Sequence, residues 1–375
     1  WAGHFHTVTY KCDRDRPIFP LFLKANLKMT PSPRRSSRPT RSSLTSLLAF
    51  LSILPLASPL SFCATRRHHR TPSSVRRPVS LSMLSSTPPL KLRKSSVEGT
   101  DGYELQLPNV EGRGQIYYDA VYAPGDKMDG AFTKDVVLYL PGLTRTTSSA
   151  KGTSLATYCE RKGYTFLSAD YYGVANADAA ADFLNASISR WVEDTIYFLE
   201  RANPGKRAVL VGAGIGGWIS VLVALKRPEL VRGIVGVGAD PDFTEDLIWN
   251  TLSKDDQEGI MSEGFRNIQW GDRVYPITRS LIEDGRKNLI LRGGTQSIDI
   301  DCPVRLLHAM YDKEVPYSTP FRLADAIKGR DVTIMIIKGG EHMLARDEDV
   351  KKMHSAVEEV LENAWEYDLT SPMSG

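Results

Sequence analysis

Short apolar runs alternate with amphipathic stretches from about residue 100 to the end of the chain. Near the start of this part, residues 103–107 and 115–122 alternate apolar and polar side chains, which predicts an antiparallel pair of strands. Continuous apolar runs predict buried strands at residues 136–140, 165–169, 208–211, 231–237, 304–308 and 332–337. Helical spacing predicts helices at residues 153–162, 188–201, 218–226 and 347–365. This alternation predicts an α/β fold with a mostly parallel central sheet and helices on both faces.

One segment, residues 241–301, interrupts this rhythm. It is polar, and Trp249, Trp270 and Tyr275 are scattered among its charged residues. We interpret it as a small inserted cap above the carboxyl edge of the sheet.

The distribution of charge separates the chain into a leader, residues 1–97, and a domain, residues 98–375. The leader holds 17 Lys and Arg but only 2 acidic residues, whereas the domain holds 30 basic and 42 acidic residues. The net charge of +3 therefore comes from the leader, and it gives no reason to expect a nucleic-acid partner. The domain is long enough to bury one sizeable core.

The leader has the layout of a targeting sequence. Met29 is the first methionine, so residues 1–28 are interpreted as an upstream extension of the reading frame. A basic stretch, an apolar run from Leu44 to Ala57 and the pair Ser61-Phe62 follow in the order of a signal peptide. Residues 63–96 are rich in Arg, Ser and Pro and lack acids, as transit peptides do. The combination resembles the bipartite plastid address of algae with secondary plastids; a mitochondrial presequence is the alternative.

The domain offers little sign of metal, disulfide or membrane chemistry. It contains only two cysteines, Cys159 and Cys302, which are far apart in the sequence and suggest a reducing compartment. Its apolar runs are too short to span a membrane. We therefore expect no metal, no cofactor and no stable membrane span in the mature domain.

A glycine-rich turn, residues 212–217, lies between a predicted strand and a predicted helix. Its sequence, GAGIGG, satisfies the G-x-G-x-x-G pattern that binds FAD or NAD. That pattern requires an acid at the end of the next strand; residues 231–239 contain none, and Asp240 comes late. The same turn also matches the frame of a nucleophile elbow, G-x-S-x-G, with Gly214 where the serine is expected.

Two later segments support the elbow interpretation. A buried strand within residues 302–316 delivers Asp312 into the loop that follows it, and the next strand is followed by His342. Elbow, Asp and His occur in this order in α/β-hydrolases. Five segments add to this order: LPG at 140–142, DYYGV at 170–174, GGW at 216–218, RPE at 227–229 and residues 302–316. With them the chain resembles that superfamily from about residue 100 onward, and within it the family of α/β-hydrolase domain-containing protein 10.

The resemblance implies a role for each matching position. Asp312 is the acid, His342 is the base, and the backbone N–H groups of Leu143 and Ile215 form the oxyanion hole. Gly214 falls on the nucleophile position and offers no oxygen, so the chemistry of an acyl-serine cannot occur there.

The resemblance also implies the substrate class, because its members are organellar depalmitoylating thioesterases and acyl-glucuronide esterases. We expect a small acyl ester or thioester, including an acylated protein, and ordinary serine-hydrolase activity that is lost or strongly impaired. In the first hypothesis, hydrolysis continues without a serine through Asp312 and His342. In the second, the chain is an inactive pseudohydrolase that binds an acyl ligand or a partner. An FAD- or NAD-dependent oxidoreductase is the third.

Overall fold

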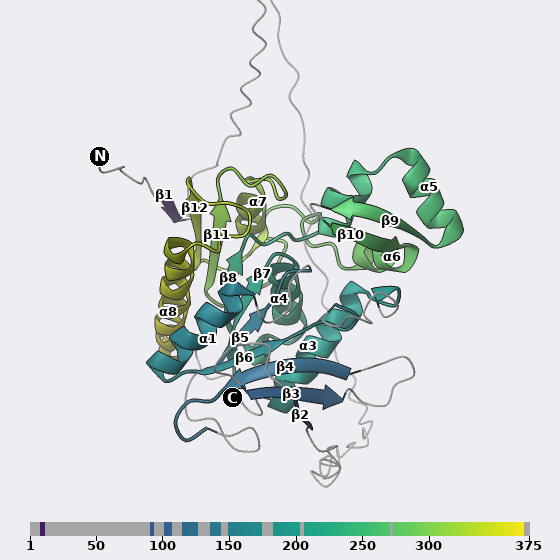
Figure 1. Cartoon of the computed structure of the whole chain (residues 1–375). Helices are drawn as coiled ribbons and strands as arrows, with labels where there is room; N and C mark the ends of the chain where they lie inside the picture. The colour runs from purple at the N-terminus through teal and green to yellow at the C-terminus, as the bar shows by residue number, and fades with distance from the viewer. Residues whose placement is uncertain are drawn as a thin grey trace, which may run out of the picture. The chain divides into compact units, whose positions relative to one another are not determined.

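The central feature of the chain is a twisted sheet whose middle strands are parallel (Figure 1). The computed structural model describes residues 8–11, 91–93, 101–106, 115–126, 136–143, 149–174, 183–202, 206–270 and 273–370. The strands are β1 (Val8–Lys11), β2 (Lys91–Arg93), β3 (Asp101–Gln106), β4 (Gln115–Val121), β5 (Val136–Leu140), β6 (Thr165–Ala169), β7 (Ala208–Ala213), β8 (Val231–Val237), β9 (Phe265–Trp270), β10 (Arg273–Thr278), β11 (Val304–Ala309) and β12 (Val332–Ile337). The helices are α1 (Ala150–Lys162), α3 (Ile188–Ala202), α4 (Ile215–Lys226), α5 (Lys254–Glu263), α6 (Arg279–Lys287), α7 (Thr319–Ala326) and α8 (Asp347–Thr370), with short helical turns at η2 (Pro228–Leu230), η3 (Thr244–Ile248) and η4 (Trp249–Thr251).

The strand order places the glycine turn in the middle of the sheet. Among the described strands the order is β1-β12-β11-β8-β7-β5-β6-β4-β3-β2. The strands from β12 to β6 run parallel to their neighbours, and β4, β3 and β2 continue the sheet in antiparallel pairs. Because parallel strands end at the same edge, the loops after β7, β8, β11 and β12 come together there.

Helices cover both faces of this sheet, as predicted. On one face, α1 and α8 pack against β-strand side chains such as Tyr139 and Val211. On the other, α3 and α4 bury Trp191 and Trp218 against side chains such as Leu210. The central strands are therefore apolar on both faces, which explains the uninterrupted apolar runs in the sequence. No helix within the described residues has both the length and the apolar character that a membrane span requires.

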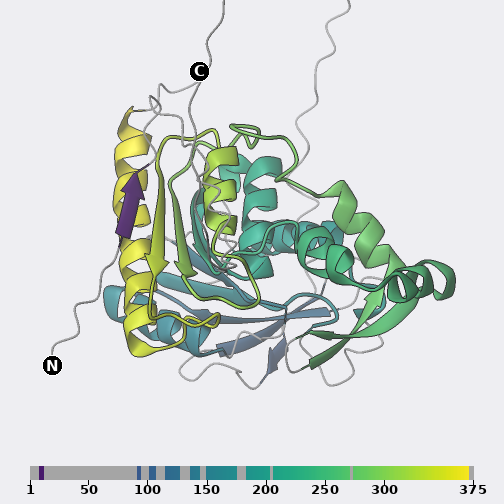
Figure 2. The ribbon, with the colours of Figure 1, turned by 90° about the horizontal axis from the view of Figure 1, so that it is seen from above.

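A cap lies between β8 and β11, in the segment that the sequence analysis assigned to an insertion. It contains η3, η4, α5, the hairpin β9–β10 and α6, and Figure 2 shows these elements gathered at one end of the molecule. The sequence did not predict the individual cap elements, because α5 and the hairpin are largely exposed and bury only a few apolar side chains. It also missed α7, whose pattern is short and begins with Pro320.

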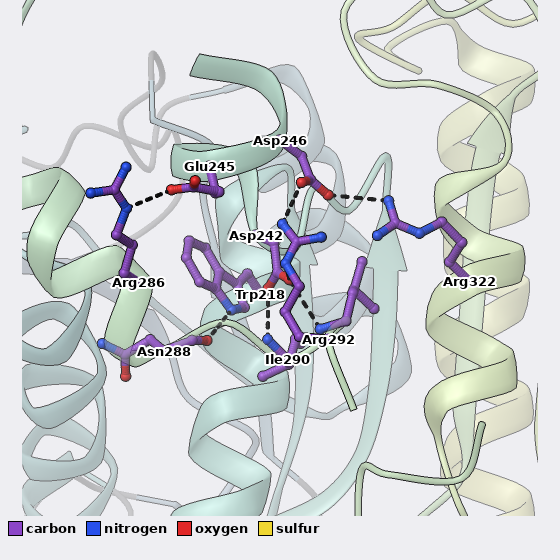
Figure 3. A network of polar contacts seen from close by, with 10 residues as sticks. Trp218, Asp242, Glu245, Asp246, Arg286, Asn288, Ile290, Arg292 and Arg322 are labelled. Carbon is purple, nitrogen blue, oxygen red and sulfur yellow. Dashed lines mark hydrogen bonds and ion pairs between the residues drawn. The ribbon is translucent and has the colours of Figure 1, made fainter. Parts of the chain in front are cut away.

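A network of polar contacts fastens the cap to the rest of the domain (Figure 3). Asp242, at the start of the cap, is fully buried and accepts hydrogen bonds from the backbone N–H groups of Ile290 (2.7 Å) and Leu291 (3.0 Å). Asp246 pairs with Arg292 and with Arg322 of α7. Trp218 of α4 donates its indole N–H to the carbonyl of Asn288 at 3.1 Å. These contacts hold the cap at both of its ends, so its apolar side chains are kept over the sheet edge.

Parts of the predicted leader pair with the sheet. β1 lies antiparallel to β12, and β2 lies antiparallel to β3. The expectation that residues 1–97 lie outside the fold therefore does not hold for these two short strands. An edge strand presents unpaired N–H and C=O groups that any extended segment can satisfy, so no apolar pattern is needed to specify them. The expected signal-peptide and transit-peptide segments, residues 29–62 and 63–90, lie outside the described residues.

Candidate active site

The glycine turn connects β7 to α4 as a sharp elbow. Gly214 has φ +55° and ψ −123°, a conformation that glycine adopts readily and residues with a Cβ rarely do, and one that lifts its position above the sheet edge. Its N–H donates to the carbonyl of Val237 at 3.1 Å, and its own carbonyl accepts from the N–H of Asp240 at 3.3 Å. The elbow is thus tied by backbone hydrogen bonds to the end of the neighbouring strand β8.

The other glycines of the motif are explained by packing. A Cβ on Gly212 would collide with the backbone of Gly216, and one on Gly216 would collide with the carbonyl of Leu140. A Cβ on Gly217 would collide with the side chain of Ala239. Only Gly214 has room, because a Cβ there would be 3.6 Å from its nearest neighbours, Gly142 Cα and Asp240 Oδ2. The G-x-G-x-x-G pattern therefore follows from close helix–strand packing without a dinucleotide.

Asp312 and His342 lie together at the same edge. The imidazole Nδ1 of His342 lies 2.9 Å from Oδ2 and 3.0 Å from Oδ1 of Asp312, so it donates to the carboxylate. The Asp312 side chain is fully buried, and it also accepts from the backbone N–H groups of Glu314 (2.8 Å) and Val315 (2.9 Å). These bonds fix the carboxylate and leave Nε2 of His342 as the nitrogen available for chemistry.

The pKa shifts of the pair follow from these contacts. Burial alone would raise the pKa of Asp312, but the hydrogen bonds from His342 and from the Val315 backbone lower it below its usual value. Burial alone would lower the pKa of His342, but the hydrogen bond and charge of Asp312, together with Glu314 and Asp240, raise it. The geometry therefore favours an ionised carboxylate that orients a basic imidazole.

Two neighbouring residues, His308 and Lys151, contact the loops that carry Asp312 and His342. His308 on β11 has a buried ring whose Nε2 donates to the carbonyl of Val315 at 3.1 Å, and burial lowers its pKa. Lys151 on α1 donates to the carbonyl of Met343 and so holds the loop that carries His342. Both contacts position the loops of the site.

A cavity of about 420 Å³ opens beside the elbow, a size within the range of ligand pockets. Its lining includes Gly214, Asp240, Glu314 and His342. The cap contributes five apolar or aromatic side chains to the same lining: Phe243, Ile248, Ile268, Tyr275 and Ile277. An apolar pocket with a few converging polar groups suits an acyl chain attached to a polar carbonyl.

Leu143 and Ile215, the residues expected to form the oxyanion hole, both line this cavity. The N–H of Ile215 is at the first turn of α4, where no carbonyl four residues earlier accepts it within the helix. Their role as oxyanion donors remains a prediction.

No serine among the described residues lines the cavity beside Gly214. Ser220 is fully buried and donates to the carbonyl of Gly216 at 2.7 Å. Ser149 caps α1 by accepting from the N–H of Gly152, and its hydroxyl also contacts that of Tyr139 at 2.8 Å. Neither serine lines the cavity.

Two acidic residues at the site were not found from the sequence. Asp240 follows β8 and directs Oδ2 toward the position of a side chain at Gly214. Glu314 places Oε2 at 3.5 Å from Nε2 of His342. The signal for Asp240 was its place just after a buried strand next to the elbow. No three His, Cys, Asp or Glu side chains within the described ranges are grouped as a metal site requires.

A family model described as the α/β hydrolase fold matches residues 135–262. The bovine palmitoyl-protein thioesterase ABHD10, mitochondrial, is 26% identical over 231 residues, which cover 60% of this chain and 72% of that protein. The human protein of the same name is 25% identical over 231 residues, with the same coverage.

Solved structures give the same fold. A protein of Agrobacterium vitis S4 described as a hydrolase is 25% identical, with a TM-score of 0.62, over 73% of this chain and 99% of its own. Alpha/beta hydrolase domain-containing protein 10 from mouse is 21% identical, with a TM-score of 0.56, over the same shares.

Proposed function

Because the chain belongs to the α/β-hydrolase superfamily, close to ABHD10, we propose that it hydrolyses acyl esters or thioesters without a serine nucleophile. The observation that carries this proposal is the intact contact between His342 and Asp312, 2.9 Å, beside an elbow that has lost its oxygen. In this geometry the ionised Asp312 orients the imidazole of His342, which can act as a general base toward a group bound in the cavity.

In the proposed reaction, a water molecule takes the space where a serine side chain would stand. His342, held by Asp312, removes a proton from this water as its oxygen attacks the acyl carbon. The N–H groups of Leu143 and Ile215 stabilise the negative charge that develops on the carbonyl oxygen. Loss of the nucleophile from a triad lowers kcat by a factor on the order of 10⁶, while an oxyanion hole and binding leave about 10³–10⁴ over water. We therefore expect slow turnover.

The relatives named above favour particular substrates and a particular compartment. Their names describe mitochondrial palmitoyl-protein thioesterases, so a long-chain thioester on a protein is the substrate class that we propose. The same names favour the mitochondrial alternative for the leader over a plastid address. The apolar cap residues Phe243, Ile248 and Ile268 would contact the acyl chain.

A pseudohydrolase that binds an acyl ligand is the second candidate. It is favoured by Gly214 itself, because a glycine at the elbow removes the acyl-enzyme step while leaving the apolar cavity in place. In this case His342 and Asp312 serve only to shape the pocket.

Hydrolysis measured with and without His342→Ala separates the two candidates. The substrates are an octanoyl thioester, followed by release of free thiol, and p-nitrophenyl octanoate. If the proposed reaction occurs, His342→Ala lowers kcat by about 10²–10⁴, the contribution of a general base. Absence of turnover in both proteins, together with binding of octanoate, would establish the pseudohydrolase instead.

A further inference from the structure

The carboxyl group of Asp240 occupies the neighbourhood of the missing serine side chain. Its Oδ2 lies 3.6 Å from the position of a Cβ on Gly214. The backbone fixes this placement, because the N–H of Asp240 donates to the carbonyl of Gly214 and the N–H of Gly214 donates to Val237. A water held where a serine hydroxyl would stand is therefore adjacent to this carboxyl group.

The other oxygen of the same carboxyl group, Oδ1, does not hold any part of the fold in place. Within the described residues, Oδ1 of Asp240 is buried and has no hydrogen-bond partner. A buried polar atom without a partner costs free energy and requires an explanation. Asp242, two residues later, shows the contrast, since both of its oxygens accept backbone N–H groups that hold the cap. Asp240 lines the cavity instead.

The charged and titratable groups around Asp240 decide its protonation. Burial raises its pKa well above the usual value, the charge of His342 acts in the opposite direction, and Asp312 and Glu314 raise it further. Tyr171, whose pKa burial raises, donates its hydroxyl to the carbonyl of Pro141 and is neutral. The raised pKa favours the protonated form of the carboxyl group, which can donate a proton.

We propose that Asp240 is a catalytic residue that replaces part of the missing serine, holding the attacking water beside His342 and donating a proton to the leaving group. This assignment rests on the proposed hydrolysis. Oδ2 is the oxygen that faces the water position, so it can accept a hydrogen bond from the attacking water and carry the proton for the leaving atom, whereas Oδ1 is buried.

The protons balance over one turnover. His342 takes a proton from water while the water oxygen bonds to the acyl carbon and the carbonyl electrons move onto the carbonyl oxygen. The C=O bond then re-forms as the bond from the acyl carbon to the leaving oxygen or sulfur breaks, and that atom takes the proton of Asp240. The products are a carboxylic acid and an alcohol or thiol. The proton on His342 then returns to the Asp240 carboxylate.

The test compares Asp240→Asn in two backgrounds and with two esters. The probes are p-nitrophenyl octanoate, whose phenolate leaves without a proton, and ethyl octanoate, whose alkoxide needs one. In the native background we expect Asp240→Asn to lower kcat on the ethyl ester by about 10²–10⁴, the contribution of a general acid, with little change in KM. On the p-nitrophenyl ester we expect a loss below about tenfold.

In a Gly214→Ser background the serine occupies the water position and His342 returns the proton, so Asp240→Asn is expected to have little effect. Asp194→Asn, which removes a buried carboxylate that does not line the cavity, is the control and should leave the ratio of the two ester rates unchanged. A thermal melting curve of each variant checks that it is folded. If Asp240→Asn does not fold, Asp240→Ala takes its place in the comparison.

Provided that the native protein is active, three results for Asp240→Asn would overturn the role of Asp240. These are an equal loss of kcat on both esters, an equal loss of kcat in both backgrounds, and no loss of kcat. A native protein without activity would overturn the proposed hydrolysis as well.

Discussion

Gly214 is the one position of the elbow where a larger side chain fits, so Gly214→Ser should install a working nucleophile. Its Cβ would lie 3.6 Å from Asp240 Oδ2 and Gly142 Cα, which is ordinary van der Waals contact. The backbone already has the φ of +55° that lifts an elbow side chain into the cavity. His342 is oriented by Asp312 at the same edge.

The cost and the gain can be estimated separately. A non-glycine residue in this conformation carries strain of about 1–3 kcal/mol, and a domain of this size loses roughly 2–4 °C in Tm per kcal/mol. We therefore expect Tm to fall by about 2–12 °C. A triad nucleophile contributes a factor on the order of 10⁶ to kcat, so even an imperfect placement should raise ester hydrolysis by about 10² or more.

Labelling with a fluorophosphonate probe is the direct assay, because the probe reacts only with an activated hydroxyl. The native protein should resist labelling, and Gly214→Ser should be labelled in a manner that depends on His342. Matched controls are Gly212→Ser and Gly216→Ser, whose Cβ atoms would collide with the backbone of Gly216 and the carbonyl of Leu140. These controls should unfold or lose the elbow, and they should not be labelled. A folded Gly214→Ser protein that stays unlabelled, or a native protein that labels strongly, would refute this account of the elbow.

Three other outcomes are expected. Asp242→Ala should lower the free energy of unfolding by about 2–4 kcal/mol and speed hydrogen exchange in the cap, because it leaves two buried N–H groups without an acceptor; unchanged stability and exchange would contradict its anchoring role. Activity should rise as pH rises through the raised pKa of His342, since the neutral imidazole is the base, and Asp312→Asn should move this rise to lower pH. A pH–rate profile of kcat/KM checks both expectations, and a rise at the same pH in Asp312→Asn would count against the Asp312–His342 pair. Because burial raises the pKa of the Cys302 thiol to about 12, iodoacetamide at pH 8 should leave it unmodified in the native protein and alkylate it in denaturant, as mass spectrometry would show.

The sequence was sufficient to predict the sheet because its central strands are buried on both faces. Residues 136–140, 165–169, 231–237 and 332–337 were predicted with the bounds that the structure gives them. The partnership of Asp312 and His342 was also predictable, since each follows a strand of the same parallel sheet and such loops meet at one edge.

The cap and the edge strands could not be predicted in the same way. Cap elements such as α5 are held by individual polar contacts and a few apolar side chains, and these leave no helical or strand periodicity. The edge strand β1 pairs with β12, and backbone pairing at a sheet edge requires no apolar pattern in the sequence. Asp240 was missed for a different reason: its significance depends on an atom-scale distance to Gly214, and its position in the sequence shows only that it follows a strand.

Gly214 and Asp240 are best understood together. With a serine at 214, the hydroxyl would take the water position beside the carboxyl oxygen of Asp240, and His342 would return the proton to the leaving group, so the carboxyl group would have no step to perform. With glycine at 214, the same carboxyl group faces a space large enough for water, and its raised pKa becomes useful because a neutral acid can donate. The acid at position 240 is therefore unnecessary for a serine mechanism but has a role in a water mechanism. We therefore infer that Gly214 and Asp240 act together in the proposed water mechanism. Gly214 leaves the space for the water molecule, and Asp240, which follows the neighbouring strand β8, supplies the second carboxyl group.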